Sequence, residues 1–218
     1  MGAKGAKRWI IRSTYERAAQ KQGYLLIAGT DEAGRGSLFG PVFAAAVILK
    51  ADTPIRGLRD SKQLPCERRE LLAARIRERA HAWAVAAVEA GEIDRINIYQ
   101  ASRLAMRRAI EKLNPAPDYL LVDALTVDLP LPQQGIIHGD ALCPTIAAAS
   151  ILAKVDRDAC MREWDAVYPQ YGLCRHKGYS TPEHLEALDR YGPTPQHRMS
   201  YEPVRQLSLF SLQEDACR

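Results

Sequence analysis

Short apolar runs alternate with longer segments of helical period along this chain, and this alternation limits its fold more than any other feature. The apolar runs cover residues 24–28, 42–49, 119–122 and 135–138, and residues 82–89 are a further candidate. The helical segments cover residues 65–79, 94–113 and 145–164, with another helix opening at Thr181 and Pro182. Strands that alternate with helices predict an α/β domain, and the helices of residues 145–205 are expected to form a smaller part against it.

Acidic residues stand where three of the apolar runs end. They are Asp31 and Glu32 after the first run, Asp123 after the third and Asp140 after the fourth. In open α/β sheets the chemistry gathers at strand ends, so these side chains are expected to meet. Each acid alone is more often a solvated strand end or a turn residue, and only the set points to function.

Carboxylates gathered without a cation would repel one another, and their pKa values would rise. Mg²⁺ relieves such repulsion, because it binds oxygen ligands and keeps waters that a substrate phosphate can displace. Two such ions about 3.5–4 Å apart can activate a water and stabilise the leaving oxygen in phosphodiester cleavage. The acids therefore favour a metal site suited to that chemistry.

Six motifs, in order along the chain, resemble those of one known family. They are GTDEAGRGSLFGPV (29–42), DSK (60–62), LLVDA (120–124), HGD (138–140), AAASILAKVDRD (147–158) and HKGYSTPEH (176–184). The combination is similar to the type 2 ribonucleases H, in particular bacterial ribonuclease HII, and the match covers nearly the whole chain. The resemblance implies a ribonuclease H-like mixed β-sheet flanked by helices, with a small helical C-terminal part.

The resemblance also implies which residues carry the chemistry. The catalytic residues and metal ligands would be Asp31, Glu32, Asp123 and Asp140, holding two Mg²⁺ or Mn²⁺ ions. Asp158 would be an accessory acid, although the Arg157-Asp158 pair is equally typical of helix-surface charge. The preference between the two metals stays open.

Discrimination of RNA from DNA requires contact with the 2′-hydroxyl, which a backbone without bulky side chains can approach. Gly34, Arg35 and Gly36 supply such a loop, and the resemblance places it at the ribonucleotide where the cut occurs. Tyr179 is expected to stack where RNA passes into DNA. The expected phosphate contacts are Ser61, Lys62 and Lys177, together with Arg35. The alternatives are an ordinary glycine turn, a core tyrosine and a charged turn.

The implied activity is endonucleolytic hydrolysis of the RNA strand in RNA/DNA hybrids, with nicking on the 5′ side of single ribonucleotides in duplex DNA. It would leave a 3′-hydroxyl and a 5′-phosphate and would serve ribonucleotide removal during replication and repair. Two alternatives are a binding module that keeps the fold without the chemistry, and ribonuclease HIII, which has an additional N-terminal domain. The four acids are present, and the GTDEAGRG motif begins at residue 29, which favours the first interpretation.

Four positions depart from the family pattern. Ser37 and Phe39 replace proline and alanine, Ala124 replaces glycine, and His138 replaces lysine. None of them is an expected metal ligand, so the activity is expected to survive, with loop rigidity and metal affinity in question. The histidines lack the HExxH spacing of a metalloprotease and are expected mostly at the surface or near phosphates.

Three parts are expected along the chain. Residues 1–13 form a flexible basic tail, residues 14–205 a type 2 ribonuclease H domain with its catalytic core ending near 165, and residues 206–218 a second tail. The second tail begins with QLSLF, which is similar to the motif by which bacterial replication and repair proteins bind the DNA sliding clamp. Its expected binding residues are Gln206, Leu207, Leu209 and Phe210. The alternative is that these residues pack back onto the chain's own last helix.

Composition adds a few exclusions. The 30 Lys and Arg against 26 Asp and Glu give a charge of +4, a mild excess that is compatible with phosphate contact. The 5 cysteines form no CxxC pair, which disfavours a zinc ribbon or disulfide framework and favours a reducing compartment. No apolar run approaches the roughly 20 residues of a membrane span, and the N-terminus lacks the apolar stretch of a signal peptide. A monomeric, cytoplasmic protein without a membrane partner is expected.

Overall fold

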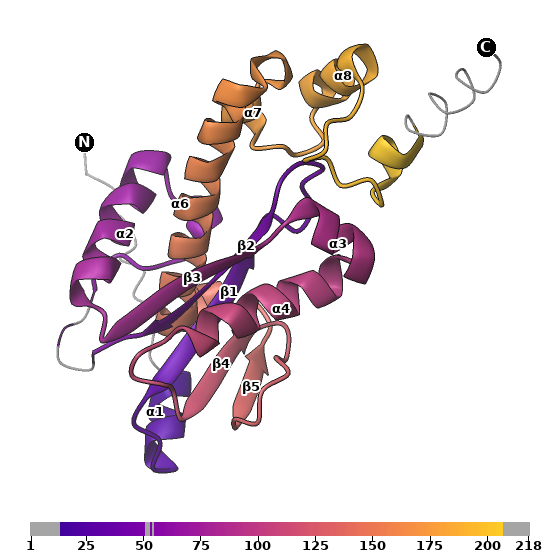
Figure 1. Cartoon of the computed structure of the whole chain (residues 1–218). Helices are drawn as coiled ribbons and strands as arrows, with labels where there is room; N and C mark the ends of the chain where they lie inside the picture. The colour runs from indigo at the N-terminus through magenta and orange to yellow at the C-terminus, as the bar shows by residue number, and fades with distance from the viewer. Residues whose placement is uncertain (1–13, 51–52, 54, 207–218) are drawn as a thin grey trace, which may run out of the picture.

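The computed structural model describes residues 14–50, 53 and 55–206 (Figure 1). The expected basic tail, residues 1–13, and three of the expected clamp-binding residues, Leu207, Leu209 and Phe210, lie outside the described residues. Within the described part, no helix has the length and apolar character needed to cross a membrane.

A five-stranded mixed sheet forms the centre of the fold, in the order β3-β2-β1-β4-β5. The strands are β1 Ile27–Ala33, β2 Val42–Ile48, β3 Ala82–Val88, β4 Tyr119–Asp123 and β5 Gln133–Ile136. β1, β2 and β3 are antiparallel neighbours, whereas β4 runs parallel to β1 and β5 runs parallel to β4. With helices on both of its faces, this sheet confirms the predicted fold class.

Helices cover both faces of the sheet, while α7 (Leu173–His176) and α8 (Pro182–Tyr191) lie beyond its end (Figure 1). The α-helices that precede them are α1 Thr14–Lys21, α2 Cys66–Arg79, α3 Ala90–Ile96, α4 Ile98–Glu111, α5 Gly139–Leu142 and α6 Pro144–Val167. β2 shows why both faces are covered: Ala44 and Ala46 pack toward α3 and α4, while Ala45 and Val47 pack toward α2 and α6. These small side chains let the helices approach the sheet closely.

The helix α6 lies against β1 at Gly29, where a Cβ atom would come within 2.3 Å of the carbonyl carbon of Thr145. Only glycine permits that approach. The helix α1, which the sequence pattern did not predict, holds the same end of α6: the buried Glu16 carboxylate accepts hydrogen bonds from the Thr145 backbone at 3.2 Å and its hydroxyl at 3.0 Å. The apolar first half of α6 thus belongs to the layer over the sheet.

The strand β1 extends further than predicted. Its ladder with β2 continues through Asp31 and Glu32, which pair with Ala45 and Ala44, so both acids lie within the strand and not after it. The parallel ladder with β4 stops at Thr30. β1 therefore continues past the end of its ladder with β4, and this continuation carries the two acids.

Two other predicted elements have different bounds. The helix predicted over residues 94–113 is interrupted at Asn97, whose φ of +66° separates α3 from α4 and whose side chain accepts the backbone N–H of Gln100 at 3.1 Å. The strand predicted over residues 135–138 ends at Ile136, and Asp140 lies in the short helix α5. The helix that opens at Pro182 is confirmed, with Thr181 as its N-cap.

The C-terminal helices form a small cluster at the far end of α6 (Figure 1). Its core contains Met161, Tyr171, Leu173 and Leu188, together with Phe39 from the segment between β1 and β2. Phe39, where the family usually has alanine, is fully buried and contacts the ring of His197 edge-on at 4.9 Å between centroids. The larger residue at this position fills the junction between the cluster and the segment that follows β1.

Ala124 offers a test of backbone strain. Its φ of +50° is a left-handed conformation that costs a residue with a Cβ atom about 1–2 kcal/mol. Ala124→Gly removes this strain, but glycine also gives the unfolded chain more conformational freedom. That freedom offsets about 0.4–1 kcal/mol of the gain in stability. We expect the free energy of unfolding, measured by urea denaturation, to rise by up to about 1 kcal/mol. The control Ala166→Gly, at an exposed helical position of α6, should lower it by about 1 kcal/mol. Equal losses in both variants would show that Ala124 is unstrained.

Candidate active site

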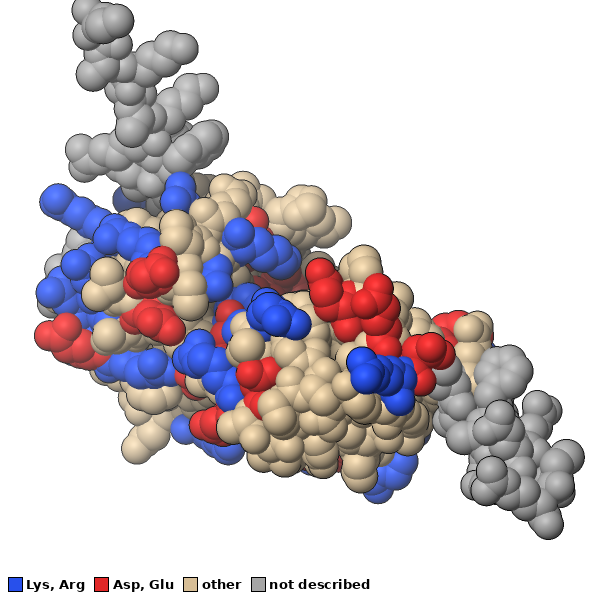
Figure 2. Space-filling view, turned by 90° about the horizontal axis from the view of Figure 1, so that it is seen from above, with Lys and Arg blue, Asp and Glu red and all other residues tan. Residues whose placement is uncertain are grey.

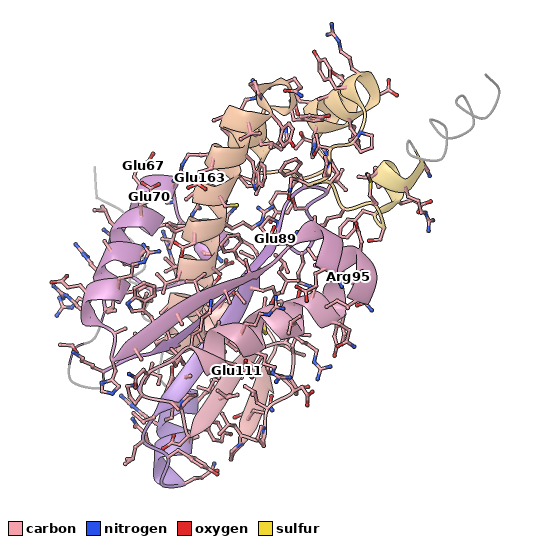
Figure 3. The ribbon with its side chains drawn as sticks, in the orientation of Figure 1. Glu67, Glu70, Glu89, Arg95, Glu111 and Glu163 are labelled. Atoms are coloured by element: carbon pink, nitrogen blue, oxygen red, sulfur yellow. The ribbon has the colours of Figure 1, made fainter. Side chains whose placement is uncertain are left out.

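The four predicted catalytic acids gather at one edge of the sheet. Asp31 and Glu32 lie in β1, Asp123 is the last residue of β4, and Asp140 lies in α5 just after β5. Oδ1 of Asp123 accepts the backbone N–H of Gly139 at 2.7 Å, which ties the end of β4 to the turn that carries Asp140. Acids elsewhere, such as Glu67, Glu70 and Glu163 in Figure 3, extend from helices, and Glu70 pairs with Arg162 at 3.6 Å.

Burial and mutual repulsion raise the pKa values of three of these acids, Asp31, Glu32 and Asp140. For Asp31, which is 5% exposed, burial is the largest cause, followed by the charges of Glu32 and Asp123. Burial also raises the pKa of Glu32, although Arg35, at 3.3 Å, partly opposes it. The pKa of Asp140 is raised by burial and then by Asp60 and Asp123. The site is therefore one that gains from a bound cation.

Asp60 is a member of this cluster that was not predicted, although it begins the DSK triplet. It hydrogen-bonds Asp140 and raises its pKa, and it accepts the backbone N–H of Lys62 at 2.9 Å. Burial lowers the pKa of Lys62, but the charges of Asp140, Asp31, Asp60 and Asp123 outweigh it and leave that pKa raised. Lys62 is thus held as a cation facing the acids.

Ser61 and Asp158 are both buried, which argues against an exposed phosphate contact for the Ser61 hydroxyl and against a helix-surface charge for Asp158. Ser61 is buried, and its Oγ lies 3.0 Å from Oγ of Ser150, whose hydroxyl hydrogen-bonds Asp31. It therefore supports Asp31 from behind and presents no hydroxyl at the surface. The Asp158 carboxylate is also buried and pairs with Lys154 at 2.7 Å and Arg69 at 3.5 Å. This carboxylate joins α6 to α2 and already has two cations as partners.

Two loops lie beside the acids, and we name them the glycine loop (residues 34–36) and the tyrosine loop (residues 177–179). They are joined where Ser37 pairs with Tyr179 and where the backbone N–H of Leu38 donates to the carbonyl of Gly178 at 2.8 Å. Gly36 has open space where a Cβ would stand. Tyr179 is 36% exposed, so its ring is available beside the glycine loop.

Three of the loop residues have definite partners. Ser37 donates its backbone N–H to the Gly34 carbonyl at 3.3 Å, a bond that the usual proline could not make. Nζ of Lys177 donates to the carbonyl of Cys174, so this side chain caps its own helix. The carbonyl of Arg35 accepts from the buried Arg198 at 2.8 Å. His138, where the family usually has lysine, is exposed with φ of +57°.

Buried histidines support the tyrosine loop from below, contrary to the expected surface positions. Nδ1 of His197 accepts the Thr194 N–H at 2.9 Å, so its Nε2 carries the proton that points to Nε2 of His184 at 3.3 Å. Nδ1 of His184 then donates to the carbonyl of Tyr179 at 3.0 Å. No local pattern in the sequence distinguishes these histidines from exposed ones.

The donor set fits a divalent metal that the substrate helps to bind. All the converging groups are carboxylates, the ligands that Mg²⁺ and Mn²⁺ accept. Among the described residues, no group of three or more His, Cys, Asp or Glu side chains is already arranged so that it could hold a metal ion by itself. Mg²⁺ is usually held by one or two carboxylates with waters and substrate phosphates, so an open site of this kind suits it.

The comparisons with known proteins agree on one family. Residues 28–204 match the family model described as Ribonuclease HII. Ribonuclease HII of Solibacter usitatus is 63% identical over 208 residues, which span 95% of this chain and 91% of that protein. The ribonuclease H2 of Pyrococcus horikoshii matches with a TM-score of 0.74 at 26% identity, over 85% of this chain and 98% of that one. A chain of the PCNA:RNase HII complex from Archaeoglobus fulgidus matches with a TM-score of 0.70 at 28% identity, over 82% of this chain and 96% of that one.

Asp31→Asn tests the repulsion at this site. Because the folded-state pKa of Asp31 is raised, the metal-free protein should lose stability as pH rises from the ordinary carboxyl range through that pKa. In the presence of a chelator at mildly alkaline pH, we expect the free energy of unfolding of the variant to exceed that of the wild type by on the order of 1 kcal/mol. It should also gain less than the wild type when Mg²⁺ is added. Asp189→Asn, exposed on α8, is the control and should change neither quantity. A variant less stable than the wild type in chelator would contradict this account.

Proposed function

The chain belongs to the ribonuclease HII family, endonucleases that hydrolyse RNA paired with DNA, and we propose that it also nicks duplex DNA on the 5′ side of single embedded ribonucleotides. The observation that supports this most is that the glycine loop directly follows the acids of β1, with Arg35 paired to Glu32, and is itself bridged to the tyrosine loop through Ser37 and Tyr179. A phosphodiester at the acids would place its neighbouring ribose next to those loops. Hydrolysis would leave a 3′-hydroxyl and a 5′-phosphate, and the activity would serve ribonucleotide removal in replication and repair.

The proposed metal ligands are Asp31, Glu32, Asp123 and Asp140, which would hold two Mg²⁺ or Mn²⁺ ions. When bound, the two ions supply an activated water and neutralise charge on the leaving oxygen. Lys62 adds a positive charge from the opposite side, where it faces the same acids and can contact a phosphate. Arg35, half-buried and paired with Glu32, is placed to exchange that carboxylate for a phosphate.

The ribose would be read by the backbone of the glycine loop and by Tyr179. Gly36 leaves its backbone open to a 2′-hydroxyl, which can donate and accept hydrogen bonds. Tyr179 presents a partly exposed ring for a base or sugar at the junction. We retain Lys177 as a phosphate contact, because an ammonium has donors beyond the one given to the Cys174 carbonyl. We assign Ser61 and Asp158 to support of the site, because their side chains are buried.

The rest of the duplex would lie along a basic side of the molecule. Figure 2 shows Lys and Arg side chains gathered on the side of α2, with fewer on the side of the C-terminal helices. The exposed arginines 68, 75 and 79 of α2 belong to this side. Contacts of this kind position nucleic acid without reading its sequence.

A sliding clamp is the proposed protein partner. The Archaeoglobus fulgidus neighbour is described as a PCNA:RNase HII complex. In this chain the QLSLF segment supplies Gln206, Leu207, Leu209 and Phe210, a directional amide with apolar side chains that suit a clamp pocket. Gln206 donates to Glu202 at 3.3 Å at the end of the described chain.

The first test is cleavage of duplex DNA that carries one ribonucleotide. With Mg²⁺ or Mn²⁺ we expect a nick on the 5′ side of the ribonucleotide, seen by denaturing electrophoresis and abolished by a chelator. Asp123→Asn should reduce the rate by on the order of a hundredfold or more, because it weakens the metal site. Asp128→Asn, an exposed acid in the loop after β4, is the control and should cut normally.

Two other outcomes of this test have distinct meanings. Intact single-ribonucleotide substrate beside a cleaved uniform hybrid would refute the single-ribonucleotide proposal alone. If both substrates stayed intact with both metals, the chain would be a nucleic-acid-binding module that keeps the fold without the chemistry.

The tail is tested by removing residues 207–218. We expect the shortened protein to nick free oligonucleotide duplex at the wild-type rate, because the deletion removes none of the proposed metal-binding or ribose-contacting residues. It should lose binding to a purified bacterial sliding clamp, measured by surface plasmon resonance. Leu209→Ala with Phe210→Ala in the full chain should do the same, since these are the proposed apolar anchors. Clamp binding that survives both changes would place the contact elsewhere.

A further inference from the structure

We propose that Arg157 is a positioning residue that holds Tyr179 against the glycine loop and so sets the preference for single embedded ribonucleotides over uniform hybrid. The inference rests on the proposed function of the two loops. Arg157 projects from α6 and is fully buried, and among the described residues it shares with Arg198 the place of largest fully buried side chain. None of the roles assigned above uses it.

A single guanidinium joins the two loops. Nη2 of Arg157 donates to the carbonyl of Lys177 in the tyrosine loop at 2.9 Å. The same nitrogen reaches the carbonyl of Phe39, just after the glycine loop, at 3.5 Å. Since Arg157 is anchored in α6, these contacts fix both loops relative to one rigid helix.

Arg157 also touches the two elements that would read the ribose. Its Cζ lies 5.3 Å from the centroid of the Tyr179 ring, within the range of a cation–π contact. On the other side, a Cβ on Gly34 would stand 2.0 Å from Nε of Arg157, and Gly34 has φ of +98°. The absence of a side chain at Gly34 is therefore what lets the guanidinium lie between the loop and the ring.

The arrangement is unfavourable for stability taken alone. Nε and Nη1 of Arg157 have no hydrogen-bond partner among the described residues, and burial lowers the pKa of the guanidinium, with Tyr179 and Asp158 opposing that effect. Buried charges with incomplete pairing are often replaced by apolar side chains at no loss of stability. If this side chain served only to fill space, methionine would do so without a buried charge. The presence of arginine therefore points to a role in the geometry of the loops.

Arg198 provides a matched comparison. It is equally buried, and it also holds the glycine loop, through the carbonyl of Arg35 at 2.8 Å, and the segment after it, through the carbonyl of Gly40 at 3.0 Å. Its guanidinium lies 5.2 Å from the Tyr201 ring, so its cation–π partner is a different tyrosine. Arg198 therefore supports the glycine loop while its ring contact is with Tyr201, whereas the ring contact of Arg157 is with Tyr179.

Displacement of Tyr179 should affect the two substrates unequally. A uniform hybrid offers a ribose at every position of the RNA strand. It can therefore shift along the protein until one of these riboses fits a displaced Tyr179 ring. A single embedded ribonucleotide offers one junction only, and a small misplacement there lowers the rate of productive binding. The ratio of kcat/KM for the single-ribonucleotide duplex to that for the hybrid therefore reports on Arg157.

The experiment compares Arg157→Met, Arg157→Lys, Arg198→Met and Tyr179→Ala on both substrates, with urea denaturation of each variant. We expect Arg157→Met to keep the wild-type free energy of unfolding or exceed it while the ratio falls about tenfold. Arg157→Lys, which keeps the charge without the planar fork, should give an intermediate ratio. Arg198→Met should lower both kcat/KM values together and leave the ratio unchanged.

An unchanged ratio in Arg157→Met, or equal losses on both substrates, would overturn the inference. If Arg157→Met does not fold, Arg157→Lys decides: a lowered ratio supports the role, and a wild-type ratio refutes it. Failure of the proposed function looks different, because the wild type would then leave the single-ribonucleotide duplex intact, or Tyr179→Ala would leave the ratio unchanged.

Discussion

The local structure depends on one unfavourable arrangement, the burial of several carboxylates at the edge where β1 runs past β4. Desolvation and the charges of Glu32 and Asp123 act together on Asp31, and water cannot screen a group that is 5% exposed. The surrounding contacts reduce this repulsion. Arg35 pairs with Glu32, the Gly139 N–H donates to Asp123, and Lys62 faces the group as a whole. A divalent cation with a bound phosphate would neutralise the repulsion that these contacts leave.

The helix α6 connects this acid site to the loops that would hold the nucleic acid. Ser150, Lys154, Arg157 and Asp158 recur at the spacing of one helical face. Along that face Ser150 hydrogen-bonds Asp31, Lys154 pairs with Asp158, and Arg157 donates to the carbonyl of Lys177 in the tyrosine loop. Gly29 sets the depth of the helix on the sheet, because no other residue allows its approach to Thr145. The distance between the acids and the tyrosine loop is therefore set by a single rigid element, the helix α6.

The sequence predicted the elements whose signals are local. The apolar runs, the four acids and the helix opened by Thr181 and Pro182 were readable because periodicity and capping act over a few residues. The extension of β1 through Asp31 was not readable, since it depends on pairing with β2. The break at Asn97 depends on one side chain that caps Gln100. The burial of Ser61, His184 and His197 follows from packing between segments far apart in the chain, which no local pattern records. Asp60 could have been found, because it stands in the DSK triplet beside Lys62.

The buried histidines and the buried acids respond to pH in opposite directions, and this gives the metal a structural consequence. Burial lowers the pKa of His197 to about 3, so its contribution to stability is present above the ordinary histidine pKa and is lost as pH falls from there. Asp31, Glu32 and Asp140 have raised pKa values, so the metal-free protein is penalised as pH rises. At neutral pH the tyrosine loop is therefore supported by uncharged rings, whereas the repulsion in the acid site increases as those carboxyl groups ionise. A bound divalent ion removes only the second effect, which makes neutral pH with metal the condition in which both halves of the site are stable together.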